Sequence, residues 1–168
     1  MKYLIVVDMQ NDFILGSLGS EHAKSIVNNV VNLVKNFNGE VIFTRDTHFE
    51  NYLNTQEGKN LPVVHCIKNT EGWQICNELL PYVKTIIDKP TFGSLELPNL
   101  LKSFNTPIEK IELCGLCTDI CVISNAMILK AAFLETPIAI HSTCCAGVTN
   151  KSHQTALNAM KAVQIEII

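Results

Sequence analysis

Residues 3–8 read YLIVVD, an apolar run that stops at a carboxylate. The run favours a β-strand that is buried on both faces, as in a parallel sheet covered by helices. Residues 20–37 then carry apolar side chains at helical spacing, with Ser20 and Glu21 suited to an N-cap and a first turn. Residues 41–44 form a second short apolar run. A strand, a helix and a strand in this order predict a parallel β-α-β unit.

The same alternation continues to the end of the chain. Further strands are predicted at residues 85–87, 111–114, 138–140 and 164–168, and further helices at 72–81, 94–102, 119–134 and 149–161. The sequence therefore predicts an α/β fold, a three-layer sandwich in which a six-stranded, mostly parallel sheet is flanked by helices on both faces. At a length of 168 residues we expect one domain, residues 1–168.

The composition disfavours nucleic-acid-binding and membrane-spanning proteins. The chain has 13 Lys and Arg against 16 Asp and Glu, a formal net charge of −3, and no basic run. Its apolar runs are far shorter than the roughly 20 residues that span a bilayer. The N-terminal apolar stretch has no cleavage site for a signal peptidase, so we expect a cytoplasmic protein. Seven cysteines without paired CxxC units at zinc-ribbon spacing predict reduced thiols rather than a disulfide framework.

Polar side chains follow several of the predicted strands. In open parallel sheets, sites form beyond the carboxyl ends of the strands, which directs attention to Asp8, Asp46, Lys89 and residues 115–121. Taken singly, each has an ordinary explanation, since Asp caps turns and a Lys beside a Pro is usually solvated. The stretch from 47 to 70 has little hydrophobic periodicity. A loop of that length inside a compact domain is more often functional than idle.

Cys121 is the candidate nucleophile. It follows the strand at 111–114 through a turn at Gly115, and we expect it in the first turn of the next helix. Free amides and the positive end of the helix dipole lower a thiol pKa that starts near ~8.5. Two other interpretations are three small core cysteines at 114, 117 and 121, or a thiol metal cluster. A CxxC that runs out of a strand is too extended to favour chelation.

Five segments together resemble a known family. They are VDMQNDF (7–13), RDTH (45–48), LPVVHC (61–66), KPTFGS (89–94) and GLCTDICV (115–122). In this order they are similar to the isochorismatase-like cysteine hydrolases, and among these to the nicotinamidases. The stretch at 115–122 is the most specific of the five.

The resemblance implies a triad of Asp8, Lys89 and Cys121. By their charges, Cys121 would attack an amide carbonyl, Lys89 would favour the thiolate, and Asp8 would carry the proton to the departing ammonia. The resemblance also implies a cis bond before Cys117 and an oxyanion hole made of the backbone amides of Cys117 and Cys121. Family members that act on isochorismate lack the nucleophile, so Cys121 favours amide hydrolysis over vinyl ether hydrolysis.

The long loop offers a metal site. In many nicotinamidases the ligands match Asp46, His48, a histidine near position 54 and His65, whereas Asn54 stands in this chain. Some relatives use a glutamate from the same loop, so the predicted set is Asp46, His48, Glu57 and His65, holding one divalent ion, zinc in preference to iron or manganese. The alternative is an Asp-x-His pattern on the surface. In nicotinamidases this metal is understood to hold the pyridine nitrogen of the substrate.

The substrate pocket is predicted from two aromatic residues. Phe13 and Phe92 match positions where the family lines its pocket, although each could equally be a core residue. The aromatic residue that many nicotinamidases have shortly before the position of His65 is replaced here by Leu61 or Pro62. We assign no role to the cysteines at 144 and 145.

These observations predict an enzyme that converts nicotinamide to nicotinate and ammonia in NAD salvage, through a thioester on Cys121. One alternative keeps the triad but takes another small amide, such as a ureido or carbamoyl compound. Another is a non-catalytic oligomeric binding protein of the same fold, since fold does not fix function. By family analogy we expect a homo-oligomer, a dimer or a tetramer.

Overall fold

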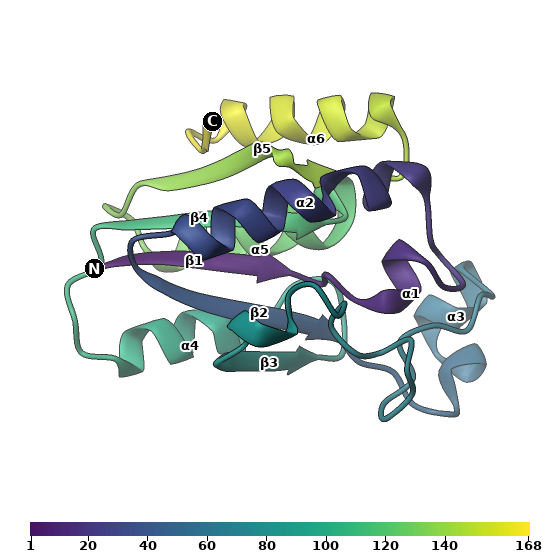
Figure 1. Ribbon diagram of the computed structural model, residues 1–168. Helices are drawn as coiled ribbons and strands as arrows, with labels where there is room; N and C mark the ends of the chain where they lie inside the picture. The colour runs from purple at the N-terminus through teal and green to yellow at the C-terminus, as the bar shows by residue number, and fades with distance from the viewer.

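A six-stranded sheet runs through the middle of the molecule in the order β3-β2-β1-β4-β5-β6 (Figure 1). This computed structural model describes residues 1–168. Every strand pairing is parallel, which confirms the predicted parallel sheet. The strands are β1 (Lys2–Val7), β2 (Glu40–Asp46), β3 (Thr85–Lys89), β4 (Lys110–Leu116), β5 (Ile138–Ala146) and β6 (Glu166–Ile167).

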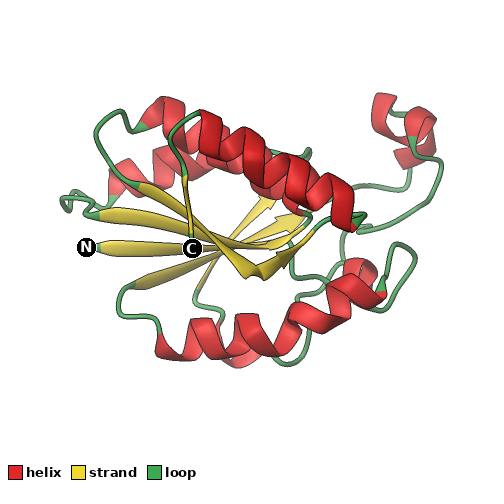
Figure 2. Cartoon of the chain, turned by 90° about the horizontal axis from the view of Figure 1, so that it is seen from above, coloured by secondary structure: helices red, strands yellow, loops and turns green.

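Helices cover both faces of the sheet, as predicted (Figure 2). One face carries α1 (Asn11–Ile14) and α2 (Glu21–Asn36); the other carries α4 (Glu96–Ser103), α5 (Ile123–Ala132) and α6 (Asn150–Ala162). A π-helical turn, η3 (Thr118–Val122), leads into α5. The segment between β2 and β3 holds η1 (Tyr52–Asn54), α3 (Gln56–Asn60) and η2 (Leu80–Tyr82). None of the helices combines the length and the hydropathy that a membrane span needs.

The core forms where the strands and helices bring their apolar sides together. Residues 4–7 of β1, at the centre of the sheet, are completely buried. Ser20 caps α2 as predicted, since its hydroxyl accepts a hydrogen bond from the Ala23 amide. The buried side of α2 repeats at helical spacing and packs against the sheet through Ala23, Ile26, Val27, Val30 and Val34.

The prediction of a helix over residues 72–81 is wrong. This segment consists mainly of turns, and η2 at its end is a short 3-10 helix. Several of its backbone groups bond to the chain after β1: Cys76 N–H donates to the Met9 carbonyl, and the Gln74 carbonyl accepts from Asn11 N–H. These bonds across the fold satisfy the backbone groups, so the local helical pattern does not decide the structure.

The topological switch point of the sheet lies at its centre, between β1 and β4. From β1 the chain adds β2 and β3 on one side, then β4 to β6 on the other. The crevice at this switch point, beyond the carboxyl ends of β1 and β4, is where open parallel sheets bind ligands. Gly115 allows β4 to lie close to β1 at this point. Its φ is +114°, and a Cβ there would collide with the backbone of Val7 on the neighbouring strand.

Replacing Gly115 by alanine is therefore expected to destabilise the fold. The backbone of an alanine at this position would have to keep a positive φ, and its Cβ would push β4 away from β1. We therefore expect the free energy of unfolding to fall by at least about 2 kcal/mol. Urea denaturation measures the change. The exposed substitution Asn99→Ala on α4 is the control, expected within about 0.5 kcal/mol of the unmodified protein. Equal midpoints for the two variants would contradict the assigned role of Gly115.

Candidate active site

A buried ion pair lies at the switch point. Lys89, the last residue of β3, and Asp8, directly after β1, have side chains with no exposed surface, and their Nζ and Oδ2 atoms are 2.6 Å apart. Asp8 has a left-handed backbone (φ 48°), a conformation that Asp tolerates better than most residues. Its other oxygen, Oδ1, accepts a hydrogen bond of 2.7 Å from the Thr44 hydroxyl.

Both members of this pair respond to burial. Burial raises the pKa of the Asp8 carboxyl, while the charge of Lys89 acts in the opposite direction. For Lys89, burial alone would lower the pKa, but Asp8, Cys121 and Asp46 raise it above its ordinary value. Lys89 is therefore an ammonium ion at neutral pH, and its positive charge interacts with Asp8, Cys121 and Asp46.

Cys121 lies against this ammonium group. The residue is on the π-helical turn η3, its side chain is almost completely buried, and its Sγ atom is 3.6 Å from Lys89 Nζ. Burial raises the pKa of the Cys121 thiol well above its ordinary value, and Lys89 opposes this shift. The sequence predicted a lowered pKa from the helix terminus, and the resemblance added the positive charge of Lys89. The structure differs because burial, together with the negative charges of Asp8 and Asp46, outweighs Lys89.

Cys117 opens the same turn. The bond between Leu116 and Cys117 is cis, as the resemblance implied. The Cys117 carbonyl accepts hydrogen bonds from the amides of Ile120 and Val122, at 3.1 and 3.0 Å, whereas its own N–H has no hydrogen-bond acceptor in the protein. Since Cys117 also lines the cavity beside Cys121, this N–H is available to an oxygen atom of a ligand.

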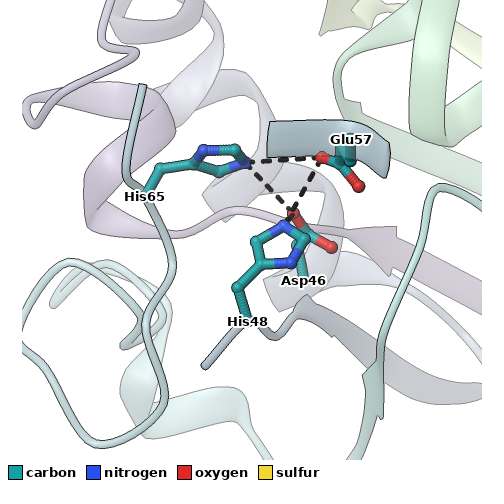
Figure 3. A group of neighbouring side chains, drawn as sticks. All are labelled: Asp46, His48, Glu57 and His65. Carbon is teal, nitrogen blue, oxygen red and sulfur yellow. Dashed lines mark hydrogen bonds and ion pairs between the residues drawn. The ribbon is translucent and has the colours of Figure 1, made fainter. Parts of the chain in front are cut away.

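Four further side chains converge on one point (Figure 3), and one of them, Asp46, contacts Lys89. Asp46 ends β2, His48 and His65 lie on the long connection, and Glu57 lies on α3. Their ligand atoms are all within 4.8 Å of one another. His48 Nε2 is 3.0 Å from Asp46 Oδ2 and 3.5 Å from Glu57 Oε1, and His65 Nε2 is 3.5 and 3.8 Å from the same two oxygens.

This group suits a divalent cation. Neighbouring ligand atoms lie about 3.4 Å apart in a tetrahedral zinc site with bonds of about 2.0–2.1 Å, which resembles the spacing here. His65 Nδ1 is 2.7 Å from the Val63 carbonyl, and an Nδ1–H that donates there leaves Nε2, which faces the carboxylates, to bind a metal ion. A histidine ligand commonly donates its second ring nitrogen to a carbonyl in this way.

The electrostatic field at these four side chains also favours a bound cation. Burial alone would lower the pKa of His48, but hydrogen bonds to Asp46 and Glu57 raise it to about 9. For Asp46, burial alone would raise the pKa, but His48, His65 and Lys89 hold it well below its ordinary value. Asp46 is thus ionised, and it also contacts Lys89 at 3.5 Å. The carboxylates that hold a proton on His48 attract a metal ion by the same electrostatics.

One cavity of about 270 Å³ joins the two groups of residues. Ten of its 15 lining residues are hydrophobic, and the others include Asp46 and Glu57 but no lysine or arginine. Phe13 and Phe92, predicted to bind substrate, both line it. The structure therefore brings all ten site residues predicted from the sequence to one rim of the sheet, and adds Leu61, Ile120 and Val148 to the cavity wall.

Sequence reasoning missed three residues that hold the site in place. The fully buried amide of Gln10 donates to the Asp46 carbonyl and accepts from the Asp46 N–H, which fixes the end of β2. Thr44 bonds Asp8, and the available signal was a polar residue directly after the apolar residues 41–43 of the strand. The ring of Tyr52 lies 4.6 Å from that of His48. No local pattern could have placed Tyr52 there.

Comparisons with known proteins show which family the chain resembles. A model of the isochorismatase domain matches residues 2–168. The chain is 31% identical over 172 residues to the isochorismatase family protein PncA of Bacillus subtilis (strain 168), covering 94% of this chain and 92% of that protein. The crystal structure of nicotinamidase/pyrazinamidase PncA from Bacillus subtilis is 27% identical with a TM-score of 0.86, covering 99% of this chain and 98% of that chain.

A second solved structure carries a metal. The pyrazinamidase of Pyrococcus horikoshii, in complex with zinc, is 25% identical with a TM-score of 0.83, covering 99% of this chain and 98% of that chain. Together the comparisons confirm the resemblance to nicotinamidases and the prediction of a nicotinamidase-like hydrolase. The fold and a family match along nearly the whole chain agree, and the chain belongs to the isochorismatase family.

Proposed function

We propose that this protein hydrolyses nicotinamide to nicotinate and ammonia, as a step of NAD salvage, through a thioester on Cys121. One observation carries the proposal: the Cys121 sulfur, beside Lys89 and Asp8, shares a small apolar cavity with a four-residue group suited to zinc. The similarity to a nicotinamidase/pyrazinamidase and to a zinc-bound pyrazinamidase supports the choice of substrate.

The first half of the reaction begins with a neutral thiol, because burial raises the pKa of Cys121. Asp8 accepts the thiol proton; apart from the ion pair with Lys89, its Oδ2 atom has no hydrogen-bond partner. The sulfur then attacks the amide carbon, and the Lys89 ammonium at 3.6 Å stabilises its negative charge. When the C–N bond breaks, Asp8 returns the proton to the leaving nitrogen, and ammonia departs.

The carbonyl oxygen becomes negatively charged during the attack. The Cys117 N–H, which has no acceptor in the protein, can donate to this oxygen. We propose that the Cys121 N–H on the same turn is the second donor. A single donor of this kind contributes about 10²–10³ in kcat, since it acts in a site with little water.

The second half regenerates the enzyme. Asp8 removes a proton from a water molecule, the oxygen attacks the thioester carbon, and the C–S bond breaks to give the carboxylic acid. The sulfur leaves as a thiolate and takes back the proton from Asp8. Lys89 remains charged throughout, because the neighbouring negative charges raise its pKa.

We propose that Asp46, His48, Glu57 and His65 hold one zinc ion. When bound, zinc would supply a Lewis-acidic position for a lone-pair donor such as a pyridine nitrogen. Asp46 contacts both His48 and Lys89, so it connects this group with the ion pair beside the nucleophile. Phe13 and Phe92 supply apolar walls for a ring between the two groups.

The lining of the cavity favours nicotinamide over anionic amides. No lysine or arginine lines it, whereas Asp46 and Glu57 do, so the proposed zinc ion is the only cation that a substrate carboxylate could meet on the cavity wall. A carbamoyl or ureido acid whose carboxylate does not reach this ion is therefore a poor candidate, since a buried unpaired charge is costly. A neutral ring with one amide matches both the volume and the polarity of the cavity.

Removing the nucleophile tests the proposed function directly. We expect Cys121→Ala to lower kcat for ammonia release from nicotinamide by at least about 10⁴-fold, because no covalent route remains. The matched control is Cys144→Ala, a buried cysteine that does not line the cavity, which should stay close to the unmodified rate. Absence of ammonia release from the unmodified zinc-loaded protein, or full turnover by Cys121→Ala, would refute the proposal.

Glu57 provides a test of the metal site. Glu57→Gln removes one anionic ligand atom, and we expect zinc affinity, measured by competition with a chromophoric chelator, to fall on the order of 100-fold. Glu50→Gln, an exposed change in the same connection, is the matched control and should bind zinc as the unmodified protein does. Equal zinc affinities for the two variants would show that Glu57 is not a ligand.

A further inference from the structure

A fully buried asparagine lies one helical turn after the nucleophile. Asn125, on α5, has no exposed surface, and its side-chain amide makes three hydrogen bonds. Nδ2 donates to the Cys121 carbonyl at 2.8 Å and to the Phe92 carbonyl at 3.1 Å, and Oδ1 accepts from the Ser94 N–H at 3.0 Å. One side chain therefore connects the turn that carries the sulfur with the loop after β3.

This loop carries two parts of the proposed site. Its first residues follow Lys89, whose Nζ donates to the Thr91 carbonyl at 3.0 Å. Phe92 lines the cavity and is 41% exposed, so it stands at the entrance. Apart from the Lys89–Thr91 bond, the only hydrogen bonds that residues 90–94 make to the rest of the protein are those to Asn125. Gly93 packs on Ile128 of α5, and a Cβ at this position would have to displace the end of the Ile128 side chain.

We propose that Asn125 is a positioning residue, whose amide holds the Phe92 wall and the Cys121 turn in fixed relation to each other. This inference rests on the proposed amide hydrolysis. Asn125 lies outside the cavity lining and touches no reacting atom, so it acts through the two residues it joins. Its bonds to Phe92 and Ser94 fix the wall against which the substrate ring packs, and its bond to Cys121 fixes the turn that carries the sulfur.

Two variants separate the two connections. In Asn125→Thr the hydroxyl can donate to the carbonyl four residues earlier, as Ser124 already does to Ile120 at 2.6 Å. This variant keeps a bond to Cys121 and loses both bonds to the loop. Asn125→Ala loses all three bonds. The matched control is Asn99→Thr, an exposed change on α4.

The kinetic test uses the zinc-loaded enzyme and nicotinamide, well below the melting temperature of each variant. We expect Asn125→Thr to raise KM about 5- to 10-fold with kcat within about twofold, because the wall against which the substrate ring packs is held less firmly while the turn that carries the sulfur keeps its bond. Asn125→Ala should raise KM similarly and lower kcat about tenfold. The threonine variant thus restores kcat but not KM, which a general loss of stability would not produce.

Hydrogen exchange of the backbone tests the connection without turnover. The Ser94 amide should exchange at least about tenfold faster in both Asn125 variants than in Asn99→Thr, because its acceptor is gone. Unchanged exchange over residues 90–96, or unchanged kcat and KM in both variants, would overturn the positioning role. If the unmodified enzyme releases no ammonia while exchange still rises at Ser94, the proposed function has failed and the connection between loop and turn stands.

Discussion

The ion pair between Asp8 and Lys89 is the constraint on which the rest of the site depends. Neither side chain touches solvent, and removing one partner of such a pair costs about 3–5 kcal/mol because the other charge stays buried. The two residues end strands that are not neighbours, since β2 lies between β1 and β3. The register of three strands must therefore be correct for the charges to meet, and the same register places Asp46 opposite Lys89.

A shared carboxylate joins the two halves of the site. Asp46 contacts Lys89 through Oδ1 and His48 through Oδ2, so a change at either side alters the field at the other. Around these charges the cavity is mostly apolar, which strengthens electrostatic interactions by excluding water. The arrangement matches what amide hydrolysis requires: a nucleophile held by a cation, a carboxylate that moves protons, and a separate group that can fix the ring.

Much of this could be predicted from the sequence because strand ends in a parallel sheet share one rim. Asp8, Lys89 and Cys121 each follow a short apolar run, and topology brings them together. The surroundings of a site residue are harder to predict than its place at the rim. The pKa of Cys121, for example, is raised by burial, which depends on residues distant in the sequence. Residues 72–81 form turns because their backbone partners lie after β1. Asn125 carried no signal, since its role depends on a loop about 30 residues earlier.

In the proposed mechanism, the ion pair supports a sulfur nucleophile that becomes acylated during turnover: Lys89 stabilises its negative charge and Asp8 carries its proton. Nicotinamide hydrolysis in the presence of hydroxylamine tests it most directly, because hydroxylamine competes with water for a thioester. The account predicts that nicotinohydroxamate forms at the expense of nicotinate as hydroxylamine increases, with one ammonia released for each molecule of the two products combined. Nicotinate as the sole product at every hydroxylamine concentration, at an undiminished rate of ammonia release, would contradict an acyl-enzyme on Cys121.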